Sequence, residues 1–120
     1  MEIEVKYRPA HSLGVVRLGP GESITAEAGA MVTMNDQVQA STAARAGAKG
    51  GLFKSLKRSF LTGESFFTNT FTGTGSEGEV TLAASLCGDM CVHDLVPGED
   101  LMIQSTSYLA SDSSIDLDTA

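Results

Sequence analysis

The sequence has no long apolar run, and this excludes a membrane-spanning helix. Its longest apolar stretches, such as residues 29–32 and 81–84, cover only a few positions, whereas a helix needs about 20 residues to cross a bilayer. The N-terminus, Met-Glu-Ile-Glu-Val-Lys, lacks the basic start and apolar middle of a signal peptide. We therefore expect a cytoplasmic protein. Its 120 residues, 42% of them hydrophobic, suit a single domain with a buried core.

The sequence is also poor in cysteine and histidine, with two of each. Along a continuous strand Cys87 and Cys91 would lie about 13 Å apart, whereas a disulfide needs Cα atoms within roughly 7 Å. A bridge would require a sharp turn at Gly88-Asp89. Structural metal sites usually have four Cys or His ligands, and His11 and His93 lie outside any ligand spacing. We expect buried free thiols in a reducing compartment, and neither a metal nor a cofactor.

Recognisable catalytic motifs are missing as well. There is no Gly-x-Ser-x-Gly elbow, and no motif places a nucleophile beside either histidine. Lys54-Ser55 follows glycines, but a P-loop needs glycine directly before the lysine, where this chain has Phe53. Glu22 and Glu99 occupy similar turns, which favours a structural use over a catalytic carboxylate pair. The sequence therefore indicates no catalytic residues and a non-enzymatic protein.

Acidic residues are absent from one segment of an otherwise acidic chain. Residues 45–58 carry a charge of +5, and the remaining three basic and fifteen acidic residues give −12, for a total of −7. Nucleic-acid binders usually spread Lys and Arg over a face, so this balance argues against nucleic acid as a partner. A local contact with an anion or an acidic partner stays open, with these candidate residues: Arg45, Lys49, Lys54, Lys57 and Arg58.

The basic segment is predicted to contain a short amphipathic helix over residues 52–61. Its apolar residues recur at helical spacing along one side, with most of the cations elsewhere. Such a helix could hold an anionic lipid headgroup, a phosphate or an acidic partner. It could also cover the open end of a β-barrel and leave its cations in solvent. We favour the second interpretation, because so short a helix buries little area.

An internal repeat with an offset of 77 residues organises the chain. Leu-Gly-Pro-Gly-Glu-Ser-Ile at 18–24 matches Leu-Val-Pro-Gly-Glu-Asp-Leu at 95–101 without a gap, and apolar positions coincide across residues 13–43 and 90–120. Proline followed by glycine suits a type II turn. Each copy is thus predicted to be a turn between two strands, at 13–18 and 24–34 and again at 90–95 and 101–110.

The residues between the two copies predict another strand pair. Residues 66–72 are rich in phenylalanine and threonine, and a glycine-rich connection leads to a further alternating stretch at 80–82. The second copy stops at Ala120, so we expect one β domain that is the N-terminal half of a longer repeated architecture. Unpaired strand edges favour pairing with other chains, which predicts a homo-oligomer. The predicted fold is an all-β antiparallel sandwich or barrel.

Four runs of residues are similar to a known family. Residues 27–31, 61–71, 88–90 and 104–110 resemble the altered inheritance of mitochondria family, member twenty-four type. The resemblance implies a jelly-roll-related fold like that of the tryptophan RNA-binding attenuation protein, in pseudo-repeated units within a chain about twice this length. It implies no catalytic set. A mitochondrial relative is linked to inner-membrane organisation, which implies a scaffold role by analogy. Cys87 departs from the proline expected there.

These observations favour a non-enzymatic assembly or scaffold protein that works through oligomer surfaces. Its basic residues would contact an acidic protein or an anionic membrane surface. The alternative is a small-ligand or RNA-binding module with the attenuation-protein fold. RNA stacking needs aromatic residues interleaved with cations, and only Phe53 and Phe60 accompany the basic residues here.

Overall fold

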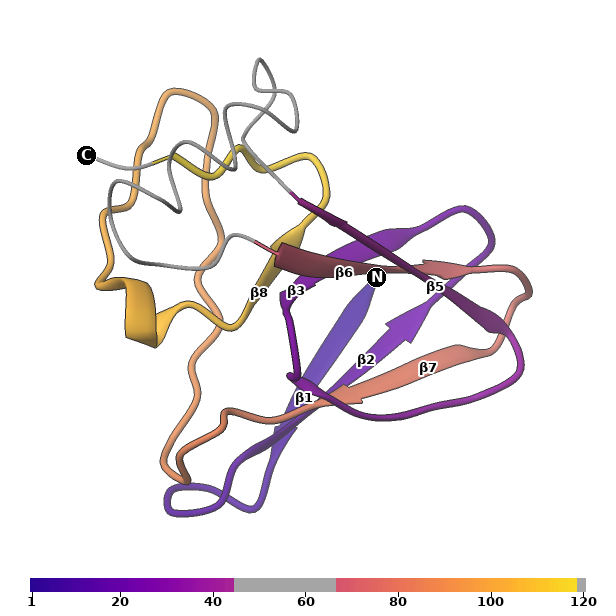
Figure 1. Cartoon of the computed structure of the whole chain (residues 1–120), viewed down its shortest axis with the longest axis horizontal. Helices are drawn as coiled ribbons and strands as arrows, with labels where there is room; N and C mark the ends of the chain where they lie inside the picture. The colour runs from indigo at the N-terminus through magenta and orange to yellow at the C-terminus, as the bar shows by residue number, and fades with distance from the viewer. Residues whose placement is uncertain (45–66, 119–120) are drawn as a thin grey trace.

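A computed structural model describes residues 1–44 and 67–118 and shows two packed antiparallel sheets (Figure 1). The first sheet has the order β1-β2-β7-β4, made by Glu2–Lys6, Leu13–Leu18, Gly78–Leu82 and Met31–Met34. The second has the order β5-β6-β3-β8, made by Val38–Ala44, Phe67–Gly73, Ser23–Glu27 and Ala110–Asp112. A 3-10 turn, η1, spans Ser105–Ser107. The predicted all-β antiparallel fold is confirmed, while the helix predicted at 52–61 lies outside the described residues.

Alternating apolar residues of the central strands build the core between the sheets. Val16 of β2 lies opposite Val80 of β7, and Ile24 of β3 lies opposite Phe71 of β6. Because side chains of a strand alternate between its two faces, these residues point into the same space. All four are at most 2% exposed. The remaining members of the buried cluster are small or aliphatic: Leu18, Ala26, Ala30, Val38 and Leu82.

The connections between strands differ from those predicted. Strands β6 and β7 were expected to form a hairpin, but they lie in different sheets, as do β2 and β3 on either side of the first Pro-Gly turn. Gly73 holds that turn, because its N–H donates to the carbonyl of Glu22 and its carbonyl accepts from the N–H of Gly21, both at 2.9 Å. The stretch 24–34, predicted as one strand, forms two strands, β3 and β4, which lie in different sheets. The turn between them contains Gly29, whose φ is 87°.

The two Pro-Gly turns of the repeat have the same local geometry. Gly21 and Gly98 have φ values of 78° and 87°. In each turn the N–H of the following glutamate bonds the carbonyl three residues back, at 3.1 Å for Glu22 to Gly19 and 3.0 Å for Glu99 to Val96. The type II turn is therefore formed in both copies, as its sequence predicts.

The prediction of strands beside the second turn, at 90–95 and 101–110, is wrong for nearly all of these residues. Residues 86–104 contain no strand, and only β8 forms in the second copy. A strand needs neighbours for its backbone N–H and C=O groups. In the first copy β2 lies between β1 and β7, and β3 lies between β6 and β8. Within the described residues, no strand takes the corresponding places beside 90–104.

Candidate functional site

The most unusual part of the structure is the strandless segment 86–104, which we call the apolar arm. It leaves the sandwich after β7 and returns through η1 to β8, and is the long orange trace at the left of Figure 1. Six large apolar side chains of this arm are at least 48% exposed: Leu86, Val92, Val96, Leu101, Met102 and Ile103. They make up half of the twelve exposed large apolar side chains that the described residues hold.

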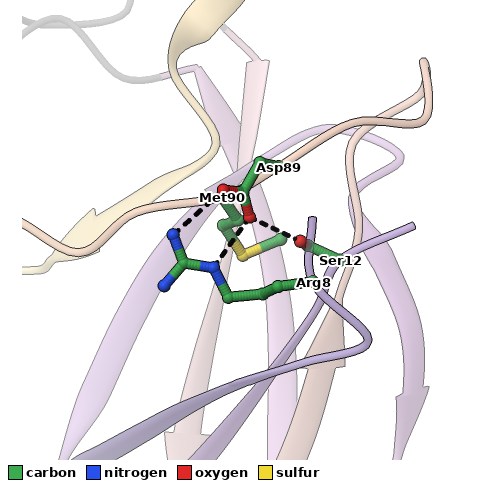
Figure 2. Close-up of polar contacts among 4 residues, drawn as sticks. All are labelled: Arg8, Ser12, Asp89 and Met90. Carbon is green, nitrogen blue, oxygen red and sulfur yellow. Dashed lines mark hydrogen bonds and ion pairs between the residues drawn. The ribbon is translucent and has the colours of Figure 1, made fainter. Parts of the chain in front are cut away.

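A polar cluster anchors the start of the apolar arm to the sandwich. Arg8 and Ser12, from the loop between β1 and β2, both point at the carboxylate of Asp89 (Figure 2). Arg8 donates from Nε to Oδ1 at 2.8 Å and from Nη2 to Oδ2 at 3.0 Å, while the hydroxyl of Ser12 donates to Oδ1 at 2.9 Å. A two-pronged guanidinium–carboxylate pair fixes orientation as well as distance. The cluster thus sets where the arm begins.

The same contacts keep the Asp89 carboxylate ionised. The hydrogen bond from Arg8 is the main reason that the pKa of Asp89 lies well below its usual range, and the backbone N–H of Met90 and the hydroxyl of Ser12 lower it further. Both oxygens are therefore already engaged with the protein. We interpret the cluster as an anchor, since a carboxylate held in this way is a poor base for catalysis.

Two further contacts complete the anchor. The N–H of Ser12 donates to the carbonyl of Gly88 at 3.0 Å. The thioether of Met90 packs over Gly14 of β2, so closely that a Cβ added at Gly14 would lie 3.1 Å from the sulfur. Five of the six exposed apolar side chains of the arm follow Met90, and Leu86 precedes the anchor.

An open hollow of about 690 Å³ lies near the N-terminus and the end of β2. Its lining includes Glu22, whose carboxylate accepts hydrogen bonds from the N-terminal amine of Met1 and from the N–H of Gly19, both at 2.6 Å. These two donors lower the pKa of Glu22. Glu22 therefore serves to hold its own turn and the N-terminus. Across residues 1–44 and 67–118, no three His, Cys, Asp or Glu side chains are grouped so that they could hold a metal ion.

The five basic residues predicted as partner contacts lie outside the described residues: Arg45, Lys49, Lys54, Lys57 and Arg58. The prediction for the cysteines is partly wrong, because Cys87 and Cys91 are free but exposed rather than buried. The arm on which they lie forms no strand at residues 86–104. His93 forms a hydrogen bond of 3.0 Å with Glu99 across the second turn.

The anchor residues were missed by the sequence analysis. Arg8 and Ser12 belong to no motif, and Asp89 was considered only as part of a turn at Gly88-Asp89 that a disulfide would require and of the family-like run 88–90. The available signal was a carboxylate beside a glycine, directly before the strand predicted at 90–95. The described parts of the chain hold no helix with the length and hydropathy needed to cross a membrane.

Comparison with known proteins gives one match. The model of a family described as "Mitochondrial biogenesis AIM24" matches residues 3–120, which is nearly the whole chain. No curated protein matches the chain. No solved structure matches it either.

Proposed function

Because the chain belongs to the Mitochondrial biogenesis AIM24 family, we propose that it is a non-enzymatic assembly protein that acts by binding other protein chains, copies of itself included. The family places it among proteins related to mitochondrial biogenesis. The specific role proposed here is supported by the surface that the chain exposes and by the use it makes of its polar groups.

The single observation that carries the proposal is the exposure of the apolar arm. Monomeric soluble proteins rarely leave large apolar patches in water, and the removal of apolar surface from water favours association. Here the side chains of Leu86 and Met102 are 83% and 80% exposed. The free energy falls when a second protein covers such side chains.

The polar groups support a non-enzymatic role. The most organised polar cluster of the described residues, around Asp89, joins the arm to the sandwich. Both carboxylate oxygens already accept hydrogen bonds there. The Asp89 carboxylate therefore helps to fix the position of the apolar arm. The arm is the surface to which we propose that partner chains bind.

Light scattering during size-exclusion chromatography tests the proposal. We expect the mass of the chain to rise with its concentration, and to stay at the monomer value in the double variant Val96→Ser/Met102→Ser. The matched control is Tyr7→Ser/Val32→Ser, which removes two large side chains of similar exposure from elsewhere and should leave association intact. A strict monomer at every concentration, or equal association of both variants, contradicts the proposal.

The basic residues 45–58 are proposed as a second contact surface, for an acidic protein or an anionic membrane. Their charge of +5 beside a remainder of −12 supports this, because basic clusters are attracted to anionic surfaces. The cytoplasmic setting expected from the N-terminal sequence stays a prediction.

A further inference from the structure

The apolar arm contains counterparts of residues that are buried in the first copy of the repeat. Val15 is 4% exposed, whereas Val92, its counterpart at the offset of 77, is 52% exposed. Ile24 is 2% exposed, whereas its counterpart Leu101 is 49% exposed. Ile103 is 48% exposed, whereas its counterpart Ala26 of β3 is fully buried. The second copy has the turn and several of the apolar side chains of the first, although His93 stands where the first copy has the core residue Val16. Within the described residues, no strand covers these side chains.

The first copy shows which structure provides that cover. Strand β7 pairs with β2 and strand β6 pairs with β3, both antiparallel. In this register Ile24 lies opposite Phe71. Gly73, at the end of β6, bonds the Pro-Gly turn through both its N–H and its carbonyl. Residues 67–82 therefore cover the first copy as a unit, by lying along both strands and joining the turn between them.

A charged residue of the second copy indicates which charge a covering strand should carry. Arg17 of β2 lies opposite Glu79 of β7 and opposite Glu2 of β1, with which it forms an ion pair of 3.6 Å. Its counterpart in the arm is Asp94, so the charge at this position is reversed. Opposite charges facing each other across strands are favourable and like charges are unfavourable. A strand that pairs beside Asp94 should therefore carry lysine or arginine where β7 carries Glu79.

From these observations we propose that the apolar arm is an acceptor for two antiparallel β-strands of a partner chain. The strands would have the apolar alternation of β6 and β7 and a lysine or arginine opposite Asp94. They would lie along residues 90–95 and 101–104 in the register that β7 and β6 adopt beside β2 and β3. Backbone hydrogen bonds supply the general affinity of such strand addition, and side chains on alternate positions supply its specificity.

A peptide with the sequence of residues 67–82 tests the proposal, because this segment covers the first copy. Two forms are compared by fluorescence anisotropy: the unmodified peptide, with Glu79, and the Glu79→Lys form. We expect the full chain to bind the Glu79→Lys peptide roughly fivefold more tightly than the unmodified one. The Asp94→Lys chain should reverse this order. The same affinity for both peptides in both chains would overturn the proposal, as would binding of neither.

A second pair of variants separates strand pairing from general stickiness. Leu101→Asp should abolish peptide binding, whereas Val32→Asp, at an exposed apolar residue of β4, should retain it. Equal binding by these two variants would contradict the proposed location. If Leu101→Asp does not fold, the reversal by Asp94→Lys still decides the question. The inference rests on the proposed function, but the two fail separately: self-association without charge-dependent peptide binding removes the strand acceptor and leaves the assembly role.

Discussion

Gly21 and Gly98, separated by 77 residues, adopt nearly the same positive φ, 78° and 87°. Each follows a proline and precedes a glutamate, and left-handed backbone of this kind favours glycine. The surroundings of the two turns nevertheless differ. The first is bonded to Gly73 at the end of β6, whereas the second lies on the apolar arm, a segment that contains no strand. A turn forms from its own residues, but the strands beside it need partners.

The contact between Gly73 and the first Pro-Gly turn predicts a costly substitution. A Cβ at Gly73 would collide with the backbone carbonyl of Gly19, so Gly73→Ala should lower the free energy of unfolding by about 1–3 kcal/mol. Urea denaturation measures this loss. Gly88→Ala is the matched control, because a Cβ at Gly88 meets nothing within 4 Å. Equal stability of the two variants would show that the turn is not held against β6.

Phe71 is predicted to be the largest single contributor to the core. It is 1% exposed and has the largest fully buried side chain of the described residues. Phe71→Ala should cost about 3–5 kcal/mol of unfolding free energy, and Phe71→Leu clearly less. Val32→Ala, at a residue that is 54% exposed, should change stability by less than about 0.5 kcal/mol. Chemical denaturation of the three variants checks this, and similar values for Phe71→Ala and Val32→Ala would contradict the sandwich core.

Acid should weaken the anchor of the apolar arm. The pKa of Asp89 in the folded chain is lowered from its ordinary value of 3.8, so the folded state binds fewer protons than the unfolded state. The contribution of Asp89 to stability is therefore fully present above about pH 4 and is lost as the pH falls further. Asp89→Asn should melt below the unmodified chain at pH 7, and the gap should narrow toward pH 2.

Melting curves of both proteins from pH 7 to pH 2 make this measurement. Glu22 and Asp112 also have lowered pKa values, but they are present in both proteins and cancel in the difference. A gap that stays constant with pH would mean that the charge of Asp89 does not stabilise the anchor.

The basic residues give a prediction for membranes. If they contact an anionic surface, the chain should co-sediment with vesicles containing phosphatidylserine, and replacement of Lys54, Lys57 and Arg58 by glutamate should remove binding. Raising the salt concentration should weaken it as well, because exposed charges are screened. Vesicle binding that survives the charge reversal would exclude this surface as the contact.

Sequence patterns predicted the elements whose stability is local. The alternation from Leu13 to Leu18 became β2, and the proline-glycine pairs became turns of the expected type. The alternating stretches and the repeated proline-glycine turn predicted an all-β sandwich or barrel. These features depend on the residues themselves or on which face of a strand is buried, and both can be read from a single sequence.

Pairing between distant strands was not predictable in the same way. The glycine-rich link between β6 and β7 suggested a hairpin, but it crosses from one sheet to the other. Strand β5 was missed because Gln39, Ala40 and Ser41 provide little apolar alternation, and β6 holds it through backbone bonds. The contact between Arg8 and Asp89 joins residues that are 81 positions apart. Only the folded topology brings them together.

Amide hydrogen exchange across a concentration series shows whether association covers the apolar arm, since it reports on both copies of the repeat at once. At low concentration we predict strong protection of β2 and β3 and rapid exchange of residues 90–104. As concentration rises and chains associate, exchange in 90–104 should slow while β2 and β3 stay unchanged. Exchange in 90–104 that remains rapid in the associated state would contradict the assignment of the apolar arm as the binding surface.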